Sequence, residues 1–188
     1  MTQPFGDLLW AAVLTGSVPG LLALATYGHQ SRQARQDRRR ELYSGAFRAV
    51  MGWVEGYYRV RRRSRGDERL VVEHLHDLWE QVAFYEGWLA TEAPELGWSY
   101  QRLAQQVKRS VSPLITAAWE MEPQPMKEEL PAGETRPETL PEVLQARDQY
   151  LDDIRRHQSV WPWGRHQLRR RYRADVAARG AANARVVA

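Results

Sequence analysis

Two histidines beside a glutamate form the group in this sequence that most resembles a metal site. Glu73 and His76 have the i, i+3 spacing that di-iron helical bundles use, and His74 lies between them. Such a centre needs a second Glu-x-x-His pair and two more carboxylates, and none of the other histidines follows a glutamate at that spacing. Zinc held by these two histidines alone would lack two ligands. We interpret the group as a solvated edge of a helix, and we expect no metal and no cofactor.

Known catalytic motifs are missing from the rest of the sequence. Cysteine is absent, which excludes disulfides, thiolate metal sites and thiol nucleophiles. No serine stands in a Gly-x-Ser-x-Gly context. There is no Gly-x-Gly-x-x-Gly and no phosphate-binding loop ending in Gly-Lys-Ser or Gly-Lys-Thr. The sequence therefore predicts a protein that is not an enzyme.

Arginines gather in two segments, and the second also carries tryptophan. The predicted contact residues are Arg35, Arg38, Arg39 and Arg40 in the first segment, and Trp161, Trp163, Arg165, Arg169, Arg170, Arg171 and Arg173 in the second. Indole rings and guanidinium groups both find partners among lipid headgroups. The same mixture can hold a nucleic-acid backbone, with indoles stacked on bases, or form a solvated basic tail. We predict contact with anionic lipid headgroups, and nucleic acid or another acidic partner is the alternative.

The net charge of +4 conceals blocks of opposite sign. Residues 28–65 hold eleven arginines against three acidic residues, and residues 155–179 hold eight against one. The blocks between them are acidic, a pattern that flat nucleic-acid surfaces seldom show. A basic block beside a membrane is attracted to anionic inner-leaflet lipids by about 1 kcal/mol for each residue close to the surface.

An uncharged stretch, residues 8–27, predicts one transmembrane helix. At about 1.5 Å of rise per residue, this length matches the roughly 30 Å hydrocarbon core of a bilayer. Lysine and arginine are absent before the stretch and five arginines follow within residues 32–40, so we expect the N-terminus outside the cell membrane and the remaining chain in the cytoplasm. A signal peptide cleaved near Ala23-Leu24-Ala25 and a buried soluble helix are the alternatives. Gly16 and Gly20 have the spacing that allows two such helices to pair in a homodimer.

Beyond this stretch, apolar residues recur at intervals of three and four, and no segment alternates as a strand does. The pattern predicts helices over residues 37–60, 67–90, 100–118 and 139–158. We expect Asp67 to cap the second helix, Pro113 to bend or split the third, and a Thr139-x-x-Glu142 capping box to open the fourth. The clearest core stripe is Val71, Leu75, Leu78, Val82, Tyr85 and Leu89. The glycines at 45, 52 and 56 weaken the first helix and mark close helix contacts.

The predicted fold class is all-α, with an N-terminal transmembrane helix that continues into a small cytoplasmic bundle of about four helices. The expected order is an outside N-terminus (1–7), the transmembrane helix (8–27), a juxtamembrane basic helix and helical bundle (28–119), a Pro- and Glu-rich linker (120–138), the last bundle helix (139–158) and a partly disordered basic aromatic tail (159–188). The linker has too few large apolar residues to offset the entropy of ordering it.

This layout resembles a large set of bacterial single-pass membrane proteins of unknown function, typical of actinobacteria. The matching residues are Arg39, Arg40, Leu42, Tyr43 and Phe47, which follow the pattern Arg-x-x-Leu-Tyr-x-x-Phe, and the later helix Tyr150–Arg156. The resemblance implies no activity. We predict a non-enzymatic interaction or scaffold module at the cytoplasmic membrane face, which binds a protein partner or a second copy. An accessory membrane protein of a plasmid or other mobile element, in contact with DNA or a transfer pump, is the alternative.

Overall fold

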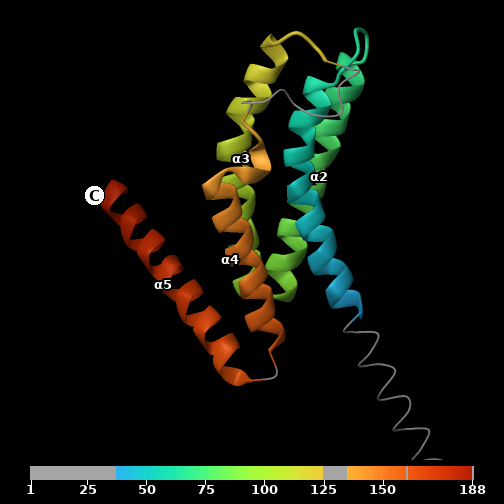
Figure 1. Ribbon diagram of the computed structural model, residues 1–188. Coiled ribbons are helices and arrows are strands. Elements are labelled where there is room, and N and C mark those ends of the chain that lie inside the picture. The colour runs from blue at the N-terminus through green and yellow to red at the C-terminus, as the bar shows by residue number, and fades with distance from the viewer. Residues whose placement is uncertain (1–36, 125–134, 160, 188) are drawn as a thin grey trace, which may run out of the picture. The chain divides into compact units, whose positions relative to one another are not determined.

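The computed structural model describes residues 37–124, 135–159 and 161–187, and every regular element in these residues is helical (Figure 1). The first helix covers residues 37–61. It is followed by α2 (Glu68–Glu92), α3 (Pro94–Glu120), the 3-10 helix η1 (Pro137–Thr139), α4 (Pro141–Gln158) and α5 (Pro162–Val187). The predicted all-α fold is confirmed. The chain forms two compact units, residues 1–41 and 42–188, and the packing described below is that of the second unit.

The predicted transmembrane helix, residues 8–27, lies outside the described residues, and so do Gly16, Gly20 and Arg35. Among the helices that are described, none combines the length and the apolar character that crossing a membrane requires. The span, its orientation and the homodimer contact therefore stay predictions.

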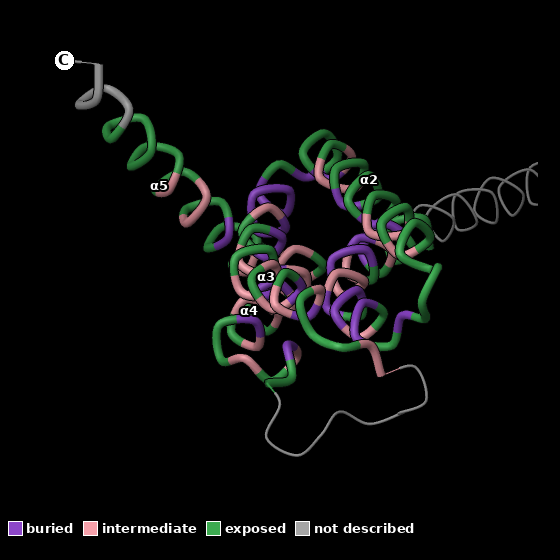
Figure 2. Tube along the Cα trace, turned by 90° about the horizontal axis from the view of Figure 1, so that it is seen from above, coloured by how far each residue is buried: buried purple, intermediate pink, exposed green. Residues whose placement is uncertain are grey.

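The core lies among the first helix, α2, α3 and α4, and Figure 2 shows buried residues on the facing sides of these helices. α3 packs extensively against both α2 and α4. In these four helices the least exposed large side chains are Val50, Val60, Val82, Leu89, Leu96, Tyr100, Leu103, Val107, Val111, Val143 and Tyr150. Full burial of one such aliphatic side chain contributes about 1.5–3 kcal/mol to folding. The apolar stripe predicted for α2 is confirmed, because Leu78, Val82 and Leu89 are buried and its other members pack against the core.

Glycines set the close approach between the first helix and α2. A Cβ at Gly52 would come within 2.5 Å of Leu78 Cδ2, and one at Gly56 within 2.6 Å of Leu75 Cδ2. A Cβ at Gly45 would collide with the Tyr85 hydroxyl. The prediction that these glycines mark close helix contacts is confirmed. The missing side chains leave room for the apolar stripe of α2.

Two arginines at the end of the first helix hold the beginning of the linker. Arg63 is 8% exposed, and its guanidinium donates to the carbonyls of Ala118 and Trp119 at 2.9 Å and of Met121 at 3.0 Å. These carbonyls lie at the end of α3, and the last carbonyls of a helix have no backbone N–H partner within it. Arg61 contributes its carbonyl, which accepts the Gln124 N–H at 2.8 Å. The buried guanidinium of Arg63 therefore satisfies carbonyls at the end of α3.

The far end of the linker is held at the same helix. The Tyr58 hydroxyl donates to the Glu138 carboxylate, with oxygen distances of 2.6 and 2.7 Å. Burial raises the pKa of Tyr58 well above its ordinary value, and the hydrogen bond to Glu138 and the charge of that carboxylate add to the shift. The described residues at both ends of the predicted linker thus make specific contacts with residues 58–63.

The start of α4 differs from the prediction. Thr139 belongs to η1, its hydroxyl donates to the Arg136 carbonyl at 2.8 Å, and Leu140 occupies the N-cap position without a side-chain bond. The predicted capping box is therefore wrong, because Pro137 opens a 3-10 turn that turns Thr139 toward its own preceding residues. Asp67 does occupy the N-cap of α2, but its side chain makes no capping bond. Pro113 lies inside α3, which runs unbroken to Glu120.

The C-terminal segment is the largest departure. The sequence predicts a partly disordered tail over residues 159–188, whereas α5 extends from Pro162 to Val187. Alanine, the strongest helix former, is the commonest residue of its second half. Leu168 is fully buried and packs with the core cluster. High helix propensity, this buried leucine and the polar contacts described below account for a helix where the sequence pattern shows no apolar stripe.

Candidate functional site

The corner between α4 and α5 is built by a glycine and an arginine. A Cβ at Gly164 would lie 3.0 Å from the Arg156 carbonyl, so the first turn of α5 comes very close to the last turn of α4. Arg165 Nε donates to the His157 carbonyl at 2.9 Å, and this bond satisfies a carbonyl at the end of α4. Trp161 and Trp163 stand outside these contacts, and each is 73% exposed.

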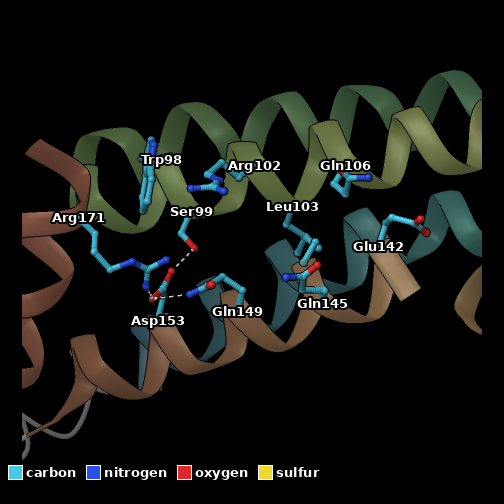
Figure 3. Close-up of a pocket in the computed structure, with 11 residues that line it drawn as sticks. Trp98, Ser99, Arg102, Leu103, Gln106, Glu142, Gln145, Gln149, Asp153 and Arg171 are labelled. Atoms are coloured by element: carbon cyan, nitrogen blue, oxygen red, sulfur yellow. Dashed lines mark hydrogen bonds and ion pairs between the residues drawn. The ribbon is translucent and has the colours of Figure 1, made fainter. Parts of the chain in front are cut away.

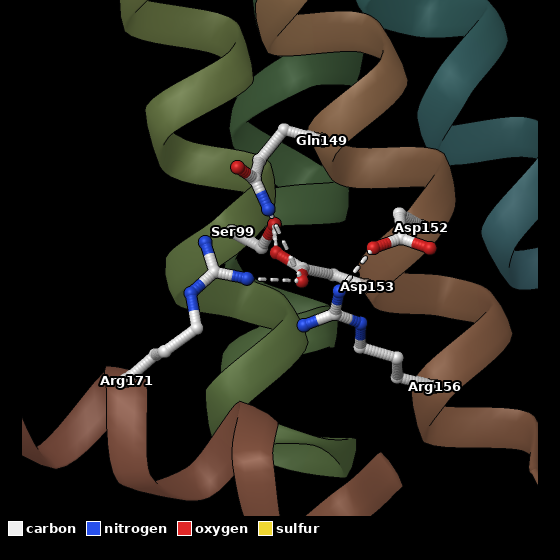
Figure 4. A network of polar contacts seen from close by, with 6 residues as sticks. All are labelled: Ser99, Gln149, Asp152, Asp153, Arg156 and Arg171. Carbon is white, nitrogen blue, oxygen red and sulfur yellow. Dashed lines mark hydrogen bonds and ion pairs between the residues drawn. The ribbon is translucent and has the colours of Figure 1, made fainter.

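A fully buried carboxylate holds the middle of α5. Asp153, on α4, has no exposed surface, and its oxygens accept from Ser99 Oγ of α3 at 2.7 Å and from Arg171 Nη1 of α5 at 2.8 Å (Figure 4). Gln149 lies beside this pair. With its side-chain oxygen turned toward Arg171, Gln149 accepts hydrogen bonds from Arg171 Nη1 and Nη2, both at 2.8 Å. In the opposite orientation the amide N–H groups face the guanidinium N–H groups, and only a 3.4 Å bond to Asp153 remains. One buried charge therefore joins three helices.

A second carboxylate, Glu95 at the start of α3, faces α5 in the same way. Its side chain is 9% exposed, and Oε1 lies 3.4 Å from Arg169 Nε and 3.5 Å from His157 Nδ1. Nearby, Trp98 Nε1 donates to the Asp175 carboxylate of α5 at 2.6 Å, and the Trp98 ring meets the Tyr172 ring edge to face. Buried charges in proteins are paired because an isolated one is expensive. Docking of α5 supplies the cations for both carboxylates.

The structure divides the predicted contact residues of the C-terminal segment into two sets. Arg165, Arg169 and Arg171 make bonds within the protein, to His157, Glu95 and Asp153. Arg170 and Arg173 are exposed, and within the described residues neither has an ion pair. Helical spacing of 3.6 residues per turn puts Trp163, His166, Arg170 and Arg173 on the side of α5 opposite Leu168. We call these four residues, together with Trp161, the outward surface.

In the first basic segment, Arg38, Arg39 and Arg40 are exposed residues of the first helix. Arg40 Nη1 lies 3.8 Å from Asp37 Oδ1, a surface pair one turn apart that contributes little to stability. These residues belong to the first compact unit, and the outward surface belongs to the second. That the two basic segments contact the same kind of anionic partner therefore stays a prediction.

The histidine group of α2 is a surface feature. His76 Nε2 lies 3.1 Å from Glu80 Oε1, and both side chains are about two-thirds exposed (70% and 67%). Burial lowers the pKa of His74, and the charge of Arg59 lowers it further. Among the described residues there is no group of three or more histidine, aspartate or glutamate side chains placed to hold a metal ion.

Sequence reasoning missed the acidic partners of α5. Asp153 carries a readable signal, because it follows Tyr150 by three residues and precedes Ile154, so a carboxylate stands on the apolar face of α4. Glu95 and Asp175 carry no such signal. Comparisons with known proteins add nothing to their interpretation, since no family model, no curated protein and no solved structure matches this chain. The resemblance to bacterial single-pass proteins stays a prediction.

Proposed function

We propose that the protein is a membrane-tethered interaction module whose α4–α5 corner rests on anionic lipid headgroups at the cytoplasmic face. The observation that carries the proposal is the outward surface: two tryptophans, each 73% exposed, beside cations that the fold does not use. Tryptophan side chains are normally largely buried in the core of a folded protein. Large aromatic side chains that stay exposed beside one another mark interaction sites. Indoles favour the boundary between headgroups and acyl chains.

The place of this corner in the fold supports a membrane contact. The ring of Tyr43, in the second residue of the 42–188 unit, meets the ring of His157 at a centroid distance of 6.2 Å. The point where the chain enters this unit is therefore beside the end of α4, and both lie toward the lower end of the unit in Figure 1. The α4–α5 corner, with Trp161 and Trp163, therefore lies at the end of the 42–188 unit where Leu42 and Tyr43 begin it.

Charge supports an anionic surface over a neutral one. Arg170, Arg173 and His166 are exposed on one side of α5, and each basic residue near an anionic leaflet contributes about 1 kcal/mol. Arginines that pair with Asp153 and Glu95 are already compensated, so they add less.

An interaction role needs no catalytic group, and α2 offers apolar surface for a protein partner, with Leu70 64% and Phe84 61% exposed.

The test uses the absence of cysteine, which allows a single spin label to be placed on the full-length protein in lipid nanodiscs. His166→Cys reports on the outward surface, and Ser64→Cys, in the exposed turn between the first helix and α2, is the control. We expect the label at 166 to lose water accessibility in nanodiscs that contain phosphatidylglycerol, but not in pure phosphatidylcholine. The label at 64 should stay in water in both. Added salt should weaken the effect, because charges are screened beyond roughly 8 Å at about 0.15 M.

Equal accessibility of the label at 166 in neutral and anionic nanodiscs would contradict the proposal. Replacing both Trp161 and Trp163 by Ala should also reduce the contact, and an unchanged contact would contradict the role of the indoles. Nucleic acid is the competing partner, in line with a mobile-element accessory protein. Tight binding of duplex DNA at about 0.15 M salt, with no response to anionic lipid, would replace the lipid proposal by that one.

A further inference from the structure

We propose that a cleft between α3 and α4 binds a small organic molecule with a carboxylate at one end and a cationic amine at the other. The proposal is independent of the lipid contact described above. It rests on a cavity, on the charges at its two ends and on the Trp98 ring, which contacts the two arginines of the cationic end.

The cleft has a volume of about 210 Å³ and opens along the line where α3 and α4 meet (Figure 3). Leu103 and Ala146 form its apolar part, and amide side chains of Gln106, Gln145 and Gln149 line its length. Arg171 reaches in from α5 at one end, and Glu142 stands at the other (Figure 3). The cleft is smaller and more polar than a typical drug-binding pocket, so it suits a small, charged ligand that convergent polar groups can orient.

The cationic end is held rigid by Trp98. The guanidinium carbon of Arg102 lies 5.1 Å from the centroid of the Trp98 ring, and that of Arg171 lies 5.8 Å from the same centroid. The indole itself is 7% exposed and is fixed by its bond to Asp175. Cation–π contacts of this kind restrain long arginine side chains, so less entropy is lost when a ligand binds.

Only one of the two guanidinium groups is available for a ligand. Arg171 is paired with the buried Asp153 carboxylate at 2.8 Å. Arg102 has no ion pair within the described residues, and its planar donors suit the two oxygens of a carboxylate. A single positive charge matches a monoanion. A phosphate, with a charge between −1.5 and −2 at neutral pH, would leave negative charge in excess beside Asp153 and Glu142.

The acidic end selects what the rest of the molecule carries. Glu142, in the first turn of α4, is exposed and has no ion pair among the residues that the structure describes. Gln145 lies one turn further along α4, between Glu142 and the cationic end. A ligand with an ammonium group at this end would gain an ion pair, whereas a second carboxylate would be repelled.

The test compares hexanoate with 6-aminohexanoate, which differ only in the terminal amine. Binding to the full-length protein is followed by the nuclear magnetic resonance signal of the Trp98 indole N–H, identified by its loss in Trp98→Phe. We expect both compounds to shift the signal in a saturable way, with 6-aminohexanoate about two- to five-fold tighter, as for one partly exposed ion pair. Inorganic phosphate should bind more weakly than either compound.

Matched variants separate the two ends of the cleft. Arg102→Gln should abolish the shift with both compounds, whereas Arg109→Gln, another exposed arginine of α3 outside the cleft, should leave it unchanged. Glu142→Gln should make the two affinities equal, and Asp148→Asn should preserve their difference. The proposal is overturned if neither compound gives a saturable shift, if phosphate binds most tightly, or if Arg102→Gln behaves like Arg109→Gln.

Discussion

Helices α3 and α5 have nearly the same length, 27 and 26 residues, yet different forces hold them in the molecule. α3 buries apolar residues from Leu96 to Ala118, at every turn. α5 buries one, Leu168, among its described side chains, and its other described contacts are ion pairs, hydrogen bonds and the ring contact of Tyr172 with Trp98. The continuous apolar contacts of α3 hold it in the core along its length. α5 is held at separate points, so the loss of one charged partner weakens one contact at a time. The following predictions test this difference.

The largest effect is expected in α3. Leu103 is fully buried, so Leu103→Ala should lower the free energy of unfolding by about 2–5 kcal/mol, measured by urea denaturation. Leu70→Ala is the control, because Leu70 is 64% exposed and such a change usually costs less than about 0.5 kcal/mol. Similar losses in both variants would show that α3 is not the centre of the core.

The next effect concerns the charge that joins three helices. Arg171→Met leaves the buried Asp153 carboxylate without its cation and should lower the free energy of unfolding by about 1–3 kcal/mol. The cost is smaller than for a fully buried ion pair because the Arg171 side chain is 33% exposed. Amides of α5 should exchange faster with deuterium in this variant, while those of α3 should not. Asp153→Asn added to Arg171→Met should recover part of the loss, since no unpaired charge remains. Arg170→Met is the neutral comparison, and an equal loss there would contradict the division of the arginines.

A smaller effect is expected at the second half of α5. Asp175→Asn replaces the charged acceptor of the Trp98 indole N–H by a neutral one, and it should cost about 0.5–1.5 kcal/mol. The signal of the Trp98 indole should also exchange faster with water. Asp148→Asn, a change of the same kind at an exposed site, should alter neither quantity. An unchanged Trp98 signal in Asp175→Asn would mean that this bond does not hold α5.

The smallest effect at neutral pH is expected from the buried tyrosines. Burial raises the pKa of Tyr100, and the neighbouring Tyr150 adds to the shift; burial also raises the pKa of Tyr150. A folded-state pKa above the unfolded value means that the contribution to stability is complete below about pH 10 and is lost as the pH rises further. Unfolding at alkaline pH should therefore coincide with late ionisation of these phenols, followed by ultraviolet absorbance. In Tyr100→Phe the loss of stability at high pH should be smaller.

Much of the bundle could be predicted from the sequence, because helix faces are encoded locally. In α2 the residues Leu75, Leu78 and Val82 recur at the helical period, and they face the core as that period requires. Gly52 and Gly56 indicated where a neighbouring helix comes close, and the positions of Leu78 and Leu75 bear this out. Alternation typical of strands is absent from the sequence, and this absence alone predicts an all-α fold.

The roles of the arginines were decided only by the tertiary structure. Arg169, Arg170 and Arg171 are consecutive and chemically identical, yet the first faces Glu95, the third faces Asp153, and the second faces away from the bundle. Their partners lie 74 and 18 positions distant in the sequence. Helix periodicity specifies which side of a helix a residue occupies, but not which distant carboxylate lies opposite. That choice requires the packing of α3, α4 and α5 in space, and the cleft between α3 and α4 arises from the same packing.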